Sequence, residues 1–559
     1  MQNVDYVVLT LYLAAVFLLG VLLSFKTKSS NDMFAAGGES PAWTSGLSAF
    51  MCMFTAGTFV VWGGIAFKYG LVAIAINLCY GVAALLVGRF VAGRWKELGV
   101  RTPAEFITLR FGAKAVQFYT WSMMLYRLVS VGVALFSLAV ILVALMPLPE
   151  GHFLRDPVTG NMSLIWAIVI FGATVITYTM VGGLWGVLMT DVLQFIILNI
   201  AVLFVIPLSL KSVGGFSNFI HNAPENFFAL TLPGKYTWFF LAGWAAIHFF
   251  MIGAEWAFAQ RFICVSSAKD ARKSIYLFGG LYLISPFLWM LPPLLYRQIN
   301  PTANPDQAYI LACKSVLPVG MVGCMLAAMF AATASSVSGQ LNVFAGVLTE
   351  QFYHRIFRPE ATEKQLIKAG RIFTVLLGAL VMGFALSIPY LGGAEKVVIS
   401  VTSLMVGPLL APTIWGLLGR RITARAVAIT AGVSFSTGIV CKLILKLSGT
   451  TVDVLIGVVL PIAILCIMHF LQKGTAEGWV RVEHLERKTR ESGIKTKASR
   501  TPAVVVAVSL VCFAIMMFSL TAFNGPEVRG LLIGFGVGLL AISLWIFAVL
   551  KKTREPGNA

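Results

Sequence analysis

Charged residues are scarce in this chain. Only 12% of its 559 residues are Asp, Glu, Lys or Arg, whereas 58% are hydrophobic and the mean hydropathy is +0.87. No stretch has the mixed composition of a folded water-soluble domain, which excludes a soluble enzyme or binding module. Instead, apolar runs of about 20 residues, long enough to cross a hydrocarbon core of about 30 Å, recur along nearly the whole sequence.

The sequence also lacks the motifs of metal, disulfide and nucleotide chemistry. Its eight cysteines are scattered, and none forms a CxxC pair or a Cys/His cluster. A disulfide framework and a zinc site are therefore not supported. Neither a phosphate-binding Walker loop nor an HExxH motif occurs, so an ATP-driven pump and a metallohydrolase have no basis.

Acidic residues are few, 23 against 42 Lys and Arg, and the formal net charge is +19. Such an excess of basic residues is also typical of nucleic-acid-binding proteins. Here, however, the positions of the basic residues along the chain follow a membrane topology. We expect fifteen spans, and 31 of the 42 basic residues then fall on one set of alternate loops, against 10 on the other. The positive-inside rule places the rich side in the cytoplasm, with the N-terminus outside the cell membrane and the C-terminus inside. The first span has no basic leader before it and is expected to be retained rather than cleaved.

The spans are expected to form one membrane transport domain over 1–559. The second and seventh spans are interrupted midway by glycine, hydroxyl and small residues, and each opens a group of five spans. Inverted repeats with broken helices at matching positions build the binding site of many secondary transporters. The predicted divisions are an extra N-terminal helix over 5–25, a first five-helix repeat over 43–211, a second over 236–419, and C-terminal helices over 423–551. The cytoplasmic loop 473–500 is predicted to be either a short helix on the membrane surface or a solvated linker.

One apolar span contains a run of small polar residues, Ala331–Asn342. Ala332, Ser335 and Ser336 share one face of a helix at this spacing. Two hydroxyls and a freed carbonyl would supply the hard oxygen ligands that suit sodium. The alternative is that serine and alanine allow close helix packing, with the hydroxyls bonded to the preceding turn.

Ionisable residues inside the spans are rare, and each needs a partner or a function. Asp191 lies about one turn inside the sixth span, either near a cation path or paired to a loop. Arg127 lies about 11 residues into its span, roughly 16 Å deep at 1.5 Å per residue. Its guanidinium either pairs with Glu255, contacts an anionic solute, or reaches a water-filled vestibule. His248 has the pattern of a hydrogen-bonded packing residue and is kept as a solute-contact candidate.

Taken together, these residues make the chain similar to the sodium:solute symporter family, whose members carry sugars, proline, pantothenate, sialic acid and monocarboxylates. Four stretches carry the resemblance: Trp43, Gly46 and Ser48 with Thr55 and Phe59; Gly182-Gly183-Leu184 through Thr190-Asp191 and Gln194; Gln260-Arg261; and Ala332, Ser335 and Ser336 with Leu341-Asn342. The resemblance implies an all-α polytopic membrane protein with the leucine-transporter fold and about 15 transmembrane helices.

The resemblance also implies the sodium ligands. The family's main sodium falls on the carbonyls of Met51, Phe54 and Ala332 and on the hydroxyls of Ser335 and Ser336. Some members hold a second sodium at positions that correspond here to Asp191, Ser335, Ser338 and Gly339. Gly339 lacks the hydroxyl of the family's serine, which weakens the case for a second ion.

For the solute, the resemblance points to the broken second span and the residues facing it. The candidate contacts are Thr55, Thr58, Arg127, His248, Glu255 and Tyr282. Thr58, Glu255-Trp256 and Tyr282 depart from the family's sugar-binding pattern, so a hexose is not supported. Arg127 favours a small carboxylate or a zwitterion.

The sequence thus predicts a sodium-coupled symporter that works by alternating access and carries out no enzymatic reaction. Its expected partners are sodium as coupling ion, a small solute and the lipid bilayer, with no cofactor and no nucleic acid; the oligomeric state stays open and a monomer is compatible. A membrane sensor on the same fold is one alternative, disfavoured because only Lys551–Ala559 follow the last span. A sugar symporter is another, and a passive channel a third, although no continuous polar stripe supports the channel.

Overall fold

The computed structural model describes residues 2–24, 40–100, 102–179, 184–492 and 500–552, and within these residues the chain is helical, with isolated β-bridges only. The first half forms α1 (Asn3–Ser24), α3 (Ala42–Cys52), the π-helical turn η2 (Thr58–Trp62), α4 (Gly63–Tyr69), α5 (Val72–Phe90), α6 (Ala92–Glu97), α7 (Pro103–Phe111), α8 (Ala113–Val143), α9 (Leu164–Thr179), α10 (Leu184–Ser212), α11 (Phe216–His221), α12 (Trp238–Ala254) and α13 (Trp256–Ile263). The second half forms α14 (Ala268–Trp289), α15 (Leu291–Ile299), η3 (Pro305–Gln307), α16 (Ala308–Val316), α17 (Met321–Val347), η4 (Leu348–Phe357), α18 (Glu363–Ser387), η5 (Ile388–Leu391), α19 (Ala394–Leu418), α20 (Ala424–Ile439), η6 (Val440–Ile444), α21 (Thr450–Val454), η7 (Leu455–Val459), α22 (Leu460–Leu471), α23 (Glu477–Ser492), α24 (Thr501–Leu520), η8 (Thr521–Phe523) and α25 (Pro526–Lys552).

Among the described residues, 11 helices are long and apolar enough to cross a membrane, or 12 if the bent pair α12–α13 is one span. The other three expected spans coincide with α1, with α3 and α4 on either side of a break, and with α9. In α9 the apolar helix Leu164–Thr177 is shorter than a full crossing. The all-helical membrane architecture is therefore confirmed, whereas the number of fifteen crossings stays a prediction.

Both predicted interruptions are present. In the second span, α3 ends at Cys52, residues 53–55 are not helical, and the chain resumes toward η2. In the seventh span, α12 and α13 meet at Glu255 with a bend of 51°. The Glu255 backbone is extended there, with φ −66° and ψ 138°, and its side chain accepts a hydrogen bond from the N–H of Ala257 as the N-cap of α13.

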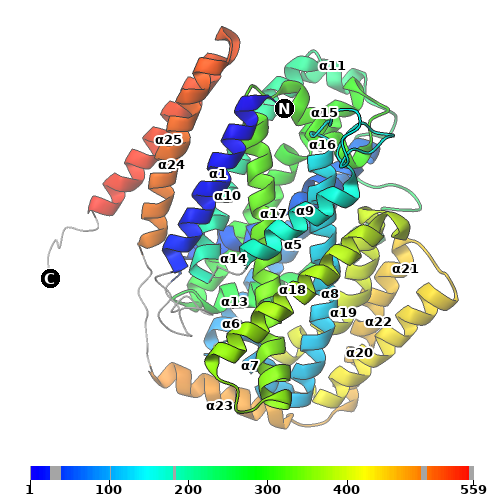
Figure 1. Ribbon diagram of the computed structural model, residues 1–559. Coiled ribbons are helices and arrows are strands. Elements are labelled where there is room, and N and C mark those ends of the chain that lie inside the picture. Colours follow the sequence, from blue (N-terminus) through cyan, green and yellow to red (C-terminus); the bar gives the residue numbers. More distant parts are fainter. Residues whose placement is uncertain (1, 25–39, 101, 180–183, 493–499, 553–559) are drawn as a thin grey trace.

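The long helices form a bundle (Figure 1), and the two broken spans pack among them. α3 packs against α10, α13 and α14, while α12 packs against α5 and α19. α17, which carries the small polar run, packs against α1, α8, α9, α10 and α18. The hairpin of α24 and α25 stands at the edge of the bundle beside α1 (Figure 1). This arrangement leaves the interrupted segments buried and surrounded by apolar helices.

Large aromatic rings fix the break in the second span. The ring centroid of Phe54 lies 4.2 Å from Trp289 and 5.1 Å from Phe59, and Phe50 lies 5.2 Å from Trp289. All four side chains are fully or almost fully buried. Aromatic pairs at such distances add stabilisation beyond the area that they bury, so the non-helical backbone is held by a rigid apolar wall.

The expected loop 473–500 contains α23, which lies across the end of the bundle opposite α11 (Figure 1). Trp479 and Val482 are buried, and α23 packs against α7. Glu486 forms an ion pair of 2.6 Å with Arg94 of α6. The predicted helix is present, but its apolar side faces the protein, because α7 offers a complementary surface. Residues 493–499 of the expected loop lie outside the described residues.

Candidate functional site

The break in the second span redirects its backbone hydrogen bonds. In a continuous α-helix, the N–H groups of Thr55, Ala56, Gly57 and Thr58 would donate to the carbonyls of residues 51–54. Here Ala56 donates to the hydroxyl of Thr333, Gly57 to that of Thr55, and Thr58 to the carbonyl of Thr55, at 2.9, 3.1 and 2.9 Å. The N–H of Thr55 lies 3.4 Å from the Thr58 hydroxyl. The carbonyls of residues 51–54 thereby lose their usual α-helical donors, and that of Met51 accepts a hydrogen bond of 3.0 Å from the N–H of Phe54 instead.

The expected sodium ligands lie on the two elements that meet at this break. Met51 and Phe54 flank the end of α3 and are 3% and 0% exposed, respectively. Ala332 and Ser335 are buried on α17, and Ser336 is half-buried there. The Ala56–Thr333 hydrogen bond joins the two elements directly, although its residues are 277 positions apart. Three carbonyls and two hydroxyls are the oxygen donors that a hard monovalent or divalent cation prefers.

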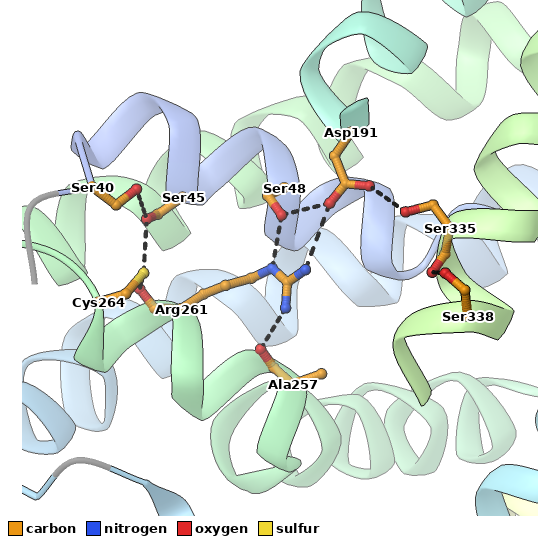
Figure 2. Close-up of polar contacts among 9 residues, drawn as sticks. All are labelled: Ser40, Ser45, Ser48, Asp191, Ala257, Arg261, Cys264, Ser335 and Ser338. Carbon is orange, nitrogen blue, oxygen red and sulfur yellow. Dashed lines mark hydrogen bonds and ion pairs between the residues drawn. The ribbon is translucent and has the colours of Figure 1, made fainter. Parts of the chain in front are cut away.

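Asp191 is the centre of a second polar cluster (Figure 2). Its Oδ2 accepts a hydrogen bond of 2.6 Å from the hydroxyl of Ser48, and its Oδ1 accepts one of 3.3 Å from Ser335. The guanidinium of Arg261 lies 3.6 Å from Oδ2 and also donates to Ser48 at 3.0 Å. Ser338 donates to the carbonyl of Ser335 at 3.1 Å. The Asp191 charge is therefore compensated by Arg261, and the cluster links α3, α10, α13 and α17.

A cavity of about 110 Å³ lies beside the break. Its walls come from both broken spans and from α5, α8, α17 and α19; they are formed by Cys52, Met53, Thr55, Gly57, Thr58, Val61, Trp62, Tyr80, Tyr126, Arg127, Ser130, Val131, Val133, Ala134, Trp244, His248, Met251, Ser336, Gln340, Val398 and Thr402. Of the six expected solute contacts, Thr55, Thr58, Arg127 and His248 line it. A mixed apolar wall with a few polar groups is typical of small-molecule sites.

Arg127 is the charged residue of the cavity wall, and it is paired with Glu255 behind it. The Nη2 atom of Arg127 lies 2.6 Å from Oε2 of Glu255, and the two side chains are 11% and 5% exposed. This is the pairing that the sequence left as one of three alternatives. The pair brings α8 to the break between α12 and α13. Glu255 does not line the cavity itself, but its ion pair with Arg127 connects it to the wall.

His248 and Tyr282 hold the wall in place by ring packing. The Nδ1 atom of His248 lies 2.8 Å from the carbonyl oxygen of Trp244, and its ring centroid is 3.7 Å from that of Tyr80. Tyr282 stacks on the same Tyr80 at 5.1 Å. Tyr282 is buried behind Tyr80 and is not among the residues that line the cavity. His248 therefore both lines and packs the cavity, whereas Tyr282 supports it from behind.

Several polar groups at the cavity have no hydrogen-bond partner within the described part of the chain. They are Nε1 of Trp244, Oε1 of Gln340 and Nε of Arg127. The sequence did not single out Trp244 or Gln340. Gln340 could have been found from its spacing, because Thr333, Ser336 and Gln340 recur on one face of α17. These groups belong to residues of the cavity wall, and a buried polar atom without a partner is unusual in a folded protein.

An ionic cluster lies at the start of α19, outside the cavity wall. Glu395 of α19 accepts hydrogen bonds from Lys235 at 2.5 Å and Tyr236 at 2.7 Å, and lies 3.7 Å from Lys68 of α4. Burial disfavours the Lys235 ammonium, but its hydrogen bond and charge attraction to Glu395, together with its contact to Tyr69, outweigh burial and raise the pKa of Lys235. Val398, one turn further along α19, lines the cavity. The cluster therefore ties together the ends of the cavity-forming elements α4, α12 and α19.

Two broken helices around a polar cavity inside a long-helix bundle define a secondary membrane transporter. A sequence model of the sodium:solute symporter family matches residues 33–433, and the chain belongs to this family. It is accordingly a sodium-coupled transporter and not an enzyme, with sodium as the coupling ion. Gly182 and Gly183 of the family-like stretch lie outside the described residues.

Similar proteins include two bacterial sodium/sialic acid symporters. The one from Proteus mirabilis is 27% identical over 76% of this chain and 87% of its own length. The one from Aliivibrio fischeri is 26% identical over 78% and 87%. The sodium/glucose cotransporter of Vibrio parahaemolyticus is 25% identical over 78% and 84%.

Solved structures confirm the leucine-transporter fold. An outward-open Na+-coupled sialic acid symporter superimposes with a TM-score of 0.69 at 22% identity, over 85% of this chain and 99% of that one. A closed transporter of the nucleobase-cation-symport-1 family gives a TM-score of 0.50 at 15% identity, over 82% and 99%.

Proposed function

We propose that the chain moves one sodium ion together with a small organic solute into the cell by alternating access. The observation that carries the proposal is the redirected hydrogen bonding at residues 55–58, which frees backbone oxygens beside the α17 hydroxyls. Sodium would be held by the carbonyls of Met51, Phe54 and Ala332 and the hydroxyls of Ser335 and Ser336. By joining α3 to α17, the ion would stabilise the state that receives solute.

A second sodium at Asp191, Ser335 and Ser338 is less well supported. Arg261 already compensates the Asp191 carboxylate, which weakens the attraction of this site for a second cation. Gly339 supplies no side-chain ligand. A single sodium agrees better with these contacts.

The solute is proposed to be a small carboxylate or zwitterion bound near Thr55, Thr58, Arg127 and His248. The Arg127 guanidinium suits a carboxylate, and the paired Glu255 could take an ammonium group of a zwitterion. The bacterial relatives named as sialic acid symporters also handle an acid. A sugar is the second candidate, because a sodium/glucose cotransporter is among the relatives. Tyr282, behind the wall, would act on the solute through Tyr80.

The proposal also includes two inverted repeats, over 43–211 and 236–419, and an orientation of the chain in the membrane. Each proposed repeat opens with an interrupted span, α3–α4 in the first and α12–α13 in the second, which supports this division. The excess of Lys and Arg on one side favours a cytoplasmic C-terminus and an extracellular N-terminus in the plasma membrane. The inward potential would add about 2.3 kcal/mol per 100 mV for each positive charge moved.

Transport into liposomes tests the function. A screen of small acids, amino acids and sugars should identify a solute that accumulates only when sodium is outside. Equal uptake in potassium, or uptake driven by a proton gradient alone, would refute sodium coupling. A hexose as the sole transported solute would replace the carboxylate proposal with the sugar alternative.

The sodium ligands are tested with Ser336→Ala. Removing a hydroxyl ligand should raise the sodium concentration needed for half-maximal uptake, with solute concentration held constant. Ser509→Ala on α24 is the matched control, because that hydroxyl bonds back to Val505 in its own helix. An unchanged sodium requirement in Ser336→Ala would remove Ser336 from the site.

A further inference from the structure

Thr333 has a bonding pattern that separates it from its neighbours on α17. It is fully buried, and its hydroxyl donates to the carbonyl of Met329 at 2.8 Å. The same oxygen accepts a hydrogen bond of 2.9 Å from the N–H of Ala56. One hydroxyl therefore closes a turn of α17 and also reaches the first residue after the break in the second span.

Ala56 needs this acceptor because the break removes its usual one. An N–H group at the start of a helical segment has no acceptor within the helix, and leaving it unpaired in an apolar interior is costly. Thr55 and Gly57 find threonine hydroxyls on their own segment. Ala56 alone among these three donates to another helix. The break is thereby tethered to α17 by a protein hydrogen bond.

The tether lies between the expected sodium ligands. Thr333 follows Ala332 directly and precedes Ser335 by two residues, while Ala56 follows Phe54 by two residues. The hydrogen bond can form only when the break and α17 are in contact, and sodium binding at Met51, Phe54, Ala332, Ser335 and Ser336 needs the same contact.

We propose that Thr333 is a positioning residue for sodium binding, which holds the broken second span against α17 so that the five oxygen ligands are assembled before the ion arrives. This role rests on the proposed sodium site. Thr333 does not contact the ion in this proposal. Its hydroxyl favours the assembled arrangement, and inward opening requires the Ala56–Thr333 hydrogen bond to break.

The test compares Thr333→Val with Thr333→Ser in purified full-length protein. Sodium binding is followed by the rise in thermal unfolding midpoint as sodium replaces choline at constant ionic strength. Valine keeps the shape but removes the acceptor, so the half-saturating sodium concentration should rise about tenfold. Serine keeps the hydroxyl and should restore a value near that of the unaltered protein.

Thr430→Val is the control. Thr430 is also fully buried, and its hydroxyl donates to Ala426 in its own helix α20 at 2.8 Å. This substitution should leave the half-saturating sodium concentration unchanged. If Thr333→Val does not accumulate, Thr333→Cys carries the same test, because a thiol is a weak acceptor of similar size.

The outcomes separate the two levels of the proposal. If Thr333→Val lowers the unfolding midpoint in choline but leaves half-saturation by sodium unchanged, Thr333 is only structural and the positioning role is wrong. If the unaltered protein itself gains no stability from sodium, the proposed sodium site fails first. A tenfold loss in valine that serine reverses supports the proposal.

Discussion

Arg127 and Glu255 are charged residues in the bundle interior, and each compensates the charge of the other. Their 2.6 Å contact leaves the pair neutral, with both side chains almost completely buried. Removing one partner would leave an uncompensated charge away from water, which costs about 3–5 kcal/mol. Replacing both residues leaves no buried charge without a partner, so the double variant avoids this cost.

We therefore expect Arg127→Gln and Glu255→Gln each to lower the thermal unfolding midpoint strongly, and the double variant to recover most of the loss. Unfolding of the three purified variants measures this coupling. Glu150→Gln is the control, because the Glu150 side chain is 95% exposed. A double variant as unstable as the sum of the single variants would mean that the two residues act independently.

At this scale, the sequence predicts residues whose chemistry is unusual for their surroundings. The Arg127–Glu255 pair could be anticipated because few ionisable residues lie in the spans. Thr333 could not, since Ala332, Ser335 and Ser336 define the expected ion-facing side of α17. The role of Thr333 depends on an N–H group 277 positions away, exposed only by the exact place of the break.

Among the elements, α19 and η7 approach so closely that their backbones touch. A Cβ atom on Gly407 would lie 1.5 Å from the carbonyl oxygen of Gly457, and one on Gly457 would lie 2.1 Å from that of Ser403. Such contacts require the absence of a side chain on both sides, as in other close packings of membrane helices. The interface is backbone against backbone, so side-chain rotation cannot relieve an added methyl group.

Gly407→Ala is accordingly expected to prevent α21–α22 from packing on α19. The measurement is the yield of folded protein in size-exclusion chromatography together with its unfolding midpoint. Gly432→Ala on α20 is the control, since nothing lies within 4 Å of a Cβ built there. Normal yield and stability of Gly407→Ala would show that α19 and η7 can separate without cost.

Element positions were predictable to different degrees. The interruptions of the second and seventh spans follow from glycine and hydroxyl residues within apolar runs. The orientation of α23 does not follow, because Trp479 and Val482 would suit a membrane surface as well as the face of α7. The choice depends on Arg94, which pairs with Glu486 from a segment nearly 400 residues earlier.

Across the whole molecule, the proposed sodium site joins distant parts of the chain. Met51 and Phe54 belong to the second span, and the other ligands belong to α17, about 280 residues later. An ion that binds the folded protein alone stabilises it by about 2.7 kcal/mol at a concentration 100 times its dissociation constant. The free energy of unfolding of the whole protein should therefore increase when sodium is present.

The unfolding midpoint should rise when potassium is replaced by sodium at constant ionic strength, and fall again when sodium is dialysed away. Differential scanning fluorimetry of the unaltered protein follows this change. Lithium and choline serve as further cations of different size and hydration. Equal midpoints in sodium, potassium and choline would argue against a selective ion site.

The bundle and its broken spans could be predicted from the sequence, but this coupling between distant segments depends on contacts that only the folded structure provides.

Cys52 closes α3 and forms part of the cavity wall, half-buried next to Met53. Its thiol therefore belongs to the wall of the candidate solute cavity, with most of its surface covered by protein. A maleimide small enough to enter would attach a fluorophore or block the pathway without an engineered cysteine. Cys441, Cys466 and Cys512 are the other cysteines that are not buried, and they lie on η6, α22 and α24, respectively, outside the cavity wall. Replacing these three restricts such labelling to Cys52, because the remaining four cysteines are buried.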